Sequence, residues 1–525
     1  MEFQNNKDVK FKNDVYLLEK AEKNKPKLNY QEIAPINLVD IQADETGFQG
    51  FKVTNSKQQL SKLAIYHLGK KDSLVFDFGT HYVGRFSIDL NSVGSPMDAP
   101  LFLHLKFGEV AADIGVDSKS YDGWISSSWI QEEYIHIDEL PYHLELPRRY
   151  SMRYVQIEVL DSSPKWKLVV NNPKITAESA VKMEDVVPIK TGDKLLDKID
   201  QVSLRTLHDC MQDVFEDGPK RDRRLWLGDL RLQALTNYQT FKNKALVKRC
   251  LYLFAGMTTA DGLVAANVFT KPRNIPDDTF MFDYSLFFIS VLHDYLVVED
   301  DKELLADLYP VAKRQLELAK KMLTDDNVVA LDDKWITFVD WSENLDKHAA
   351  AQAIMIYTVK QFKKLAEMKK NSEDVINTEK LINSLTKAAL DNYYDAKEQL
   401  FVSGPMNQVN IASQAWMVLA HVLPDDKAKM VMKKALEKLF PVKGVGTPYM
   451  YHHIVAALFE VGLKEEAIAE MKNYWGKMVE YGADTFFEAF DPQRPNFSPY
   501  GSPIINSYCH AWSCTPTYFI RKYLV

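Results

Sequence analysis

The spacing of apolar residues in this chain of 525 residues changes near residue 185. Between about Asn29 and Lys182, apolar and polar residues alternate in short runs, as in LVFDFGTHYVGRFSIDL at 74–90. A period of two is typical of β-strands, and several short strands separated by Pro, Gly, Asp and Ser predict a β-sandwich. We expect a domain of this kind at 1–187. Further strands are expected at 99–109, 129–137, 150–160 and 165–172.

From about Lys190 the period becomes helical, and apolar residues of 192–215 form one broad stripe. About twelve helices without intervening strands fit six antiparallel pairs, an (α/α)6 barrel at 188–525. A helical solenoid is the alternative, but no repeat of fixed period supports it. The expected fold class is therefore multidomain α+β. After the helix at 192–215, helices are expected to begin near Asp229, Lys244, Phe280, Lys302, Ala349, Glu373, Ala412, Asp425, Tyr449, Lys464 and Ile505.

Charge and composition exclude several classes of function. The net charge of -8 argues against a nucleic-acid partner, because no basic surface is available to neutralise phosphates. No run approaches the roughly 20 apolar residues that cross a bilayer, so no membrane partner is expected. The N-terminal MEFQNNKDVKFKND does not resemble a secretory signal, and four cysteines are too few for a disulfide framework. A cytoplasmic protein without a metal or cofactor is expected.

The stretch EDGPKRDRRLWLGDL, 216–230, gathers four carboxylates and four cations around Trp226. Asp217-Gly218-Pro219 can end one helix and Gly228-Asp229 can begin the next, so the segment is expected to be a loop. Its charges fit a pocket for a polar ligand. They also fit helix caps paired with arginines, and we give the two interpretations similar weight.

A second acidic stretch, YGADTFFEAFDP at 481–492, encloses Glu488 among phenylalanines. Burial there would raise the pKa of the carboxyl, which favours a specific role. The alternative is a carboxylate that pairs with an arginine or caps a helix. Asp283, Trp341 and His510 also lie in aromatic stretches, although Trp341 could fill the core and His510 could cap the last helix.

Two distant carboxylate loops with aromatic faces suit glycoside hydrolysis. One carboxylic acid protonates the leaving oxygen, a second carboxylate acts at the anomeric carbon, and aromatic rings cover the apolar face of the sugar.

The first of these stretches resembles the acidic loop of glycoside hydrolase family 78, the α-L-rhamnosidases. The resemblance covers most of the chain beyond residue 70 and implies an N-terminal β-sandwich, an (α/α)6 catalytic barrel and inversion at the anomeric carbon. The motifs that carry it are Asp217, Arg221, Asp222, Trp226, Gly228 and Asp229, then FDFGTHYVGRFSIDL (76–90), FGE (107–109), PRRYSMRYVQIEV (147–159), VDW (339–341), TFFEAFD (485–491) and CHAW (509–512).

The resemblance implies that Asp222 is the general acid and Glu488 the general base. It assigns rhamnose hydroxyls to Asp217, Arg221, Asp229 and His510, apolar walls to Trp226 and Trp341, and an additional wall to Asp283. The implied substrate is a small rhamnosylated glycoside or oligosaccharide.

The acidic loop departs from the family in one respect. Many members have Glu as the acid in an R-D-E-R stretch, whereas this chain has R-D-R-R. Alignment on Asp217 puts Arg223 at the acid position, and alignment on Trp226 and Asp229 puts Asp222 there; we prefer the second. Because cations nearby would lower the pKa of Asp222, we expect Arg221 and Arg223 to turn toward other acids.

The chain ends after the final expected helix, without the C-terminal β-domain common in the family. A compact enzyme for small substrates is therefore expected, with a homodimer suggested. Two alternatives remain. One is a lyase or uronyl hydrolase that uses Arg221, Arg223 and Arg224 to bind an acidic sugar, and the other is a non-catalytic sugar-binding relative.

Overall fold

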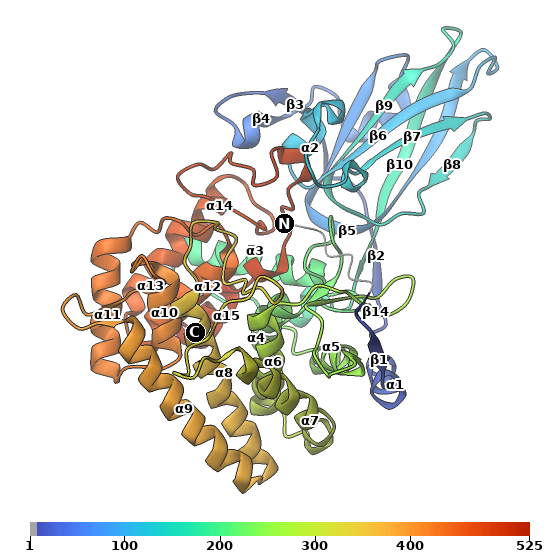
Figure 1. Cartoon of the computed structure of the whole chain (residues 1–525). Coiled ribbons are helices and arrows are strands. Elements are labelled where there is room, and N and C mark those ends of the chain that lie inside the picture. The colour runs from blue at the N-terminus through green and yellow to red at the C-terminus, as the bar shows by residue number, and fades with distance from the viewer. Residues whose placement is uncertain (1–7) are drawn as a thin grey trace.

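The computed structural model describes residues 8–525 and contains an antiparallel β-sheet and a larger helical part (Figure 1). The sheet lies between residues 29 and 179, and most helices lie beyond residue 194. The predicted order, a β-region followed by a helical region, is confirmed. Within residues 8–525, no helix combines the length and apolar character needed to span a bilayer.

Nine antiparallel strands form one sheet in the order β2–β10–β5–β9–β6–β7, with β3 and β8 also paired to β5, and β4 paired to β3. The five predicted strands correspond to β5, β6, β7, β9 and β10. The other four strands, β2, β3, β4 and β8, were not predicted; they are short, and few of their residues are buried. The strands are β2 (Asn29–Ile33), β3 (Asn37–Ala43), β4 (Phe51–Asn55), β5 (Ser73–Gly94), β6 (Leu101–Gly108), β7 (Glu132–Ile137), β8 (Tyr142–Glu145), β9 (Tyr150–Asp161) and β10 (Trp166–Ser179).

β5 connects the two halves of the sheet. Its first half pairs with β3 and β9, and its second half pairs with β8 and β10. The register with β9 shifts between Asp77 and Tyr82, where Gly79 has a φ of 84° that other residues adopt only at a steric cost. Phe76 and Phe86, from the two halves, are fully buried in one core. The β-region is thus one continuous hydrogen-bonded sheet whose two halves share a core; the predicted sandwich stays a prediction.

The helical part has its own, larger core. A short segment before the sheet joins it, since β1 (Phe11–Asn13) pairs with β12 (Met257–Thr259) and α1 packs on α5. The helices are α1 (Val15–Lys23), α2 (Ala111–Gly115), α3 (Lys194–Cys210), α4 (Leu227–Gln239), α5 (Lys244–Gly256), α6 (Phe282–Val298), α7 (Lys302–Ala319), α8 (His348–Lys369), α9 (Ser372–Tyr393), α10 (Ile411–Leu419), α11 (Asp425–Leu439), α12 (Pro448–Glu460), α13 (Lys464–Met471), α14 (Lys477–Glu480) and α15 (Pro516–Tyr523).

Alternate helices contact one another in a series. α4 contacts α6, α6 contacts α8, α8 contacts α10, and α10 contacts α12. The 3-10 turn η9 (Ala511–Ser513) contacts both α12 and α4, and α15 also contacts α4. The intervening helices α7, α9, α11 and α13 pack against members of this series. α6 is buried on all sides, whereas α11 buries one face only, so α6 lies inside and α11 outside.

Most helices begin close to their predicted starts. α5, α7, α11 and α13 begin at the predicted residues Lys244, Lys302, Asp425 and Lys464. The predicted last helix is wrong: a turn at Pro503–Ile505 and a buried non-helical segment precede α15, which begins only at Pro516. His510 therefore does not begin the last helix, because it precedes η9.

In the described part of the chain, four ion pairs join the sheet and α2 to the helical part, and all but Arg153–Asp484 are buried. On the sheet side they come from β5, β9, the residue before β9 and α2, and on the other side from the end of α3 and the loops after α3 and α14 (Figure 1). The pairs are His81–Asp209 at 2.6 Å, Lys220–Asp113 at 2.7 Å, Arg149–Glu216 at 2.6 Å and Arg153–Asp484 at 2.6 Å. Two of them, those of Glu216 and Lys220, hold the stretch that contains Asp217 and Asp222.

Candidate active site

The acid loop, residues 216–226, connects α3 to α4 and is non-helical, as predicted. Asp222 and Arg223 have consecutive positive φ values of 65° and 55°. Such residues cost on the order of 1–3 kcal/mol each and cluster at functional sites. The Arg223 guanidinium donates to the Arg149 carbonyl at 3.0 Å, while the Asp222 carboxylate lies 3.8 Å from the Arg221 guanidinium. The strained turn thus directs the side chains of Asp222 and Arg223 toward different partners.

Glu488 lies in the base loop, residues 483–502, which follows α14. Its carboxylate is buried, forms an ion pair with Arg221 and accepts a hydrogen bond from the Tyr500 hydroxyl at 2.5 Å. Burial raises the pKa of Glu488; the charge of Arg221 and the Tyr500 hydrogen bond oppose that shift, and the charge of Asp222 adds to it. The alternative to a specific role for Glu488 was pairing with an arginine. Such an arginine, Arg221, is present, but it also faces Asp222.

Arg221 brings the two loops together. One of its terminal nitrogens contacts Glu488 and the other lies 3.8 Å from Asp222, so one guanidinium spans both carboxylates. Its Nε donates to the Ile505 carbonyl at 3.2 Å. Arg221 has turned toward another acid, Glu488, as expected, but it also lies 3.8 Å from Asp222. Arg223 has turned toward a backbone carbonyl, where an acid was expected.

Asp217, Asp229 and His510 meet beside this pair. His510 lies 3.6 Å from Asp229 and 3.8 Å from Asp217, and all three side chains are buried. Burial lowers the pKa of His510 well below its ordinary value and raises those of Asp217 and Asp229 well above theirs. Among the described residues, Asp229 Oδ1 and His510 Nδ1 have no hydrogen-bond partner. Unsatisfied buried polar atoms are rare in folded proteins, so these two are suited to ligand hydroxyls.

Asp217 and Asp229 match the alternative interpretation, helix caps paired with arginines, only in part. The N-cap of α4 is Trp226, and the basic side chain beside both acids is His510. Asp217 Oδ1 accepts a hydrogen bond from the Arg224 backbone at 2.9 Å, which closes the acid loop. Asp229 lies in the first turn of α4, where a negatively charged carboxylate interacts favourably with the helix dipole.

Aromatic rings line this region. Trp226 lies edge-on to Tyr284 with ring centres 6.3 Å apart, and Trp341 lies edge-on to Tyr500 at 5.3 Å and Trp512 at 6.3 Å. Phe338 packs against Tyr284 and Trp512. The predicted walls Trp226 and Trp341 thus belong to one aromatic cluster, which contains further members that the motifs did not indicate.

Asp283 supports this wall from behind. Its two carboxylate oxygens accept hydrogen bonds from the backbone of Phe338 and Val339, both at 3.0 Å. Asp340 is buried in the same way and accepts hydrogen bonds from Gly446 and Thr447. Direct contact between Asp283 and a sugar stays a prediction.

Tyr500 is the contact of Glu488 that the sequence analysis missed. The only signal was its position in a long non-helical segment rich in aromatic and acidic residues. That segment runs from the helical part toward α2 and β4, where Asn496 accepts a hydrogen bond from the Gln49 backbone at 2.7 Å (Figure 1).

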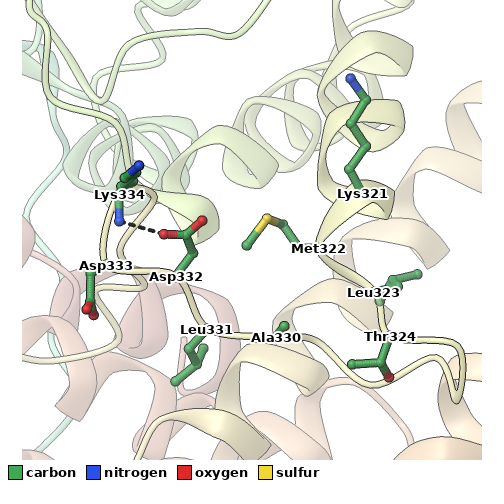
Figure 2. Close-up of a pocket in the computed structure, with 9 residues that line it drawn as sticks. All are labelled: Lys321, Met322, Leu323, Thr324, Ala330, Leu331, Asp332, Asp333 and Lys334. Carbon is green, nitrogen blue, oxygen red and sulfur yellow. Dashed lines mark hydrogen bonds between the residues drawn. The ribbon is translucent and has the colours of Figure 1, made fainter.

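A separate surface cavity of about 560 Å³ lies beside η6 (Lys320–Met322) and the turn after it (Figure 2). In that turn the Lys334 backbone donates to Asp332 at 2.8 Å. Its lining includes no residue of the acid loop or the base loop. This cavity is therefore distinct from the cluster around Arg221.

The cluster has the chemical groups of a glycosidase. Two carboxylates from distant loops face one guanidinium, further acids and a neutral imidazole lie beside them, and aromatic rings form a wall. Acid–base catalysis and the binding of sugar hydroxyls need groups of these kinds.

Comparisons with known proteins identify the family. A family model described as the glycosyl hydrolase family 78 alpha-rhamnosidase N-terminal domain matches residues 35–177. A second, the bacterial alpha-L-rhamnosidase 6 hairpin glycosidase domain, matches residues 184–524. No match was found among curated proteins.

Solved structures agree with these matches. A rhamnosidase from Klebsiella oxytoca, solved with rhamnose bound, is 45% identical over 98% of this chain and 100% of its own, with a TM-score of 0.95. A family 78 rhamnosidase from Bacillus sp. GL1 shares the fold at 19% identity and a TM-score of 0.72, over 90% of this chain and 49% of its own. This chain is a glycoside hydrolase and belongs to family 78, the α-L-rhamnosidases.

Proposed function

We propose that this enzyme removes terminal α-L-rhamnose from small glycosides or oligosaccharides with inversion at the anomeric carbon. The observation that carries the proposal is the guanidinium of Arg221, which contacts Glu488, 267 residues away, and faces Asp222. The rhamnose in the Klebsiella oxytoca relative supports rhamnose as the sugar.

Asp222 is the general acid and Glu488 the general base in this proposal. The Asp222 side chain is 26% exposed and the Glu488 side chain 6%, so the acid lies nearer solvent, where a leaving group departs. Asp222 protonates the glycosidic oxygen as its bond to the anomeric carbon breaks. Glu488 takes a proton from the water that attacks the opposite face, which inverts the configuration. The two carboxyl groups should lie roughly 6.5–9.5 Å apart in the complex.

The sugar hydroxyls would meet the polar atoms that lack partners. Asp229 Oδ1 and His510 Nδ1 face each other at 3.6 Å without forming a hydrogen bond, and Asp217 lies beside them. Trp226 and Trp341 would contact the apolar parts of the ring. Asp283 would act indirectly, through the backbone at 338–339.

We also propose that the helices form an (α/α)6 barrel at 188–525, after a β-domain at 1–187. The series α4–α6–α8–α10–α12, with η9 touching both α12 and α4, supports a closed ring. The homodimer and the cytoplasmic location stay predictions.

The two alternatives have less support. A lyase or uronyl hydrolase needs a cationic subsite, yet Arg223 donates to a carbonyl and Arg224 lies over the Phe269 ring at 4.2 Å. A non-catalytic relative was expected if Arg223 occupied the position of the acid. Arg223 instead points to the β-domain, and Asp222 faces Arg221.

Neutral isosteres test the proposal. Asp222→Asn and Glu488→Gln should each lower turnover of a nitrophenyl α-L-rhamnoside by about 10²–10⁴-fold, the usual contribution of an acid or base. Glu480→Gln, at an exposed residue at the end of α14, serves as a control and should keep wild-type activity. NMR of the first sugar released should show the β-anomer. Full activity in both variants, or release of the α-anomer, would contradict the assignment.

A further inference from the structure

Tyr500 lies in the base loop and has no role in the function described above. It is 3% exposed, and its hydroxyl donates to Glu488 Oε1 at 2.5 Å. The Arg221 guanidinium contacts the other carboxylate oxygen, Oε2. Each oxygen of Glu488 therefore has one donor from the protein.

The tyrosine ring is fixed by its own contacts. The Arg221 guanidinium lies over its face at 4.4 Å, within the range of a cation–π interaction. Trp341 packs edge-on to it at 5.3 Å, and Trp124 from the β-domain lies at 6.1 Å. Tyr500 thus touches both partners of the Arg221–Glu488 pair, and the hydroxyl cannot leave Glu488 without displacing the ring.

We propose that Tyr500 is the positioning residue of the general base. Its hydroxyl holds Oε1, its ring holds Arg221 on Oε2, and the remaining lone pairs of the carboxylate are directed at the attacking water. This inference rests on the proposed function, because it requires Glu488 to be the base.

The same contact affects the proton affinity of the base. Burial raises the pKa of Glu488, and the hydrogen bond from Tyr500 opposes that rise by favouring the charged form. Burial and the charge of Glu488 raise the pKa of Tyr500 itself well above its ordinary value, so the hydroxyl remains a donor at neutral pH. The charge of Arg221 opposes the rise more strongly, and Tyr500 adds to that opposition, so both favour the charged form that a base requires.

Tyr500→Phe tests the proposal, since it removes the hydroxyl and keeps the ring. We expect kcat/KM to fall roughly 10–100-fold, the range for a hydrogen bond to a charged group, with the loss mainly in kcat. The acidic limb of the pH profile should move to higher pH, because the pKa of Glu488 rises when the donor is lost. Tyr481→Phe, just before the base loop, is the matched control and should change neither quantity.

A double variant separates positioning from a general loss of structure. If Tyr500 acts through Glu488, then adding Tyr500→Phe to Glu488→Gln should cause little further loss of activity. An unchanged pH profile in Tyr500→Phe, unchanged activity, or a full additional loss in the double variant would each overturn the proposal. An active Glu488→Gln single variant would instead overturn the proposed function.

Discussion

At the scale of single residues, this site contains buried polar atoms without hydrogen-bond partners and a glycine that leaves room for a neighbouring ring. Asp229 Oδ1 and His510 Nδ1 are buried without partners among the described residues. Each such atom destabilises the free protein by roughly 1–3 kcal/mol, and a ligand hydroxyl that reaches it removes that cost. In the proposed function, these are the atoms that would meet the sugar hydroxyls.

Gly228 provides space in the same way. It lies in the first turn of α4, where a Cβ atom would meet the Tyr284 ring at 2.4 Å. Gly228→Ala should therefore destabilise the enzyme by about 1–3 kcal/mol, as overpacking does, even though alanine favours helices. It should also lower activity, because Tyr284 packs against Trp226. Urea unfolding and kcat/KM measure the two effects.

Gly446 offers a comparison for that substitution. A Cβ atom there meets nothing within 4 Å, so Gly446→Ala should leave stability within about 0.5 kcal/mol of wild type. Equal effects at positions 228 and 446 would show that contact with the Tyr284 ring is not the cause.

At the scale of elements, buried carboxylates fix the loops of the site. Val339 has a φ of 50°, which is unusual for a β-branched residue. Its backbone N–H donates to Asp283, which also binds the N–H of Phe338. The Asp283 carboxyl in α6 thus stabilises the strained segment that carries Trp341. The aromatic wall therefore depends on α6, which lies behind it.

Glu470 in α13 is a second buried acid, and its burial affects the stability of the fold. Burial raises its pKa from 4.5 to about 7, with a small opposing contribution from Asn473. A raised pKa stabilises the folded state below pH 4.5, and this contribution disappears as the pH rises through about 7. Glu470→Gln should therefore raise the free energy of unfolding at pH 8 by up to about 3 kcal/mol, at about 1.4 kcal/mol per pKa unit.

At pH 4 the same substitution should have little effect, because both states of the wild type are protonated. Urea unfolding at the two pH values measures the difference. Glu465→Gln, at an exposed residue of the same helix, should give no such pH dependence. A gain for Glu470→Gln that is equal at both pH values would contradict burial as the cause.

The sequence predicts α11, where burial is one-sided, but fails in one long stretch before α15 that is buried throughout. α11 has an apolar face and a charged face, and its start at Asp425 was predicted. Residues 504–517 are buried without interruption, so no period of 2 or 3.6 separates a helix from an extended segment there. The same limit applies to the site: the motifs indicated Asp222 and Glu488, but Tyr500 lies in no motif and acts only through tertiary contacts.

At the scale of the whole molecule, the β-domain holds the acid loop in place. Arg149, just before β9, is buried and binds Glu216 at the start of the acid loop. Its backbone carbonyl binds Arg223 in the same loop, and Lys220 binds Asp113 of α2. The conformation that presents Asp222 therefore depends on the sheet, and a helical part without it should fold with a disordered acid loop.

The Arg149–Glu216 pair allows this dependence to be measured. Arg149→Met leaves the buried Glu216 without its counter-ion, which should destabilise the enzyme by about 3–5 kcal/mol. Glu216→Gln should cost less, because Arg149 keeps a second buried acid, Glu178, at 3.7 Å. The double variant removes both charges and should lose less than the sum of the single losses, in stability and in kcat/KM. The exposed Arg148–Glu133 pair is a matched control, and Arg148→Met should cost less than about 1 kcal/mol. Additive losses, or full kcat/KM in destabilised Arg149→Met, would mean that the sheet does not hold the acid loop.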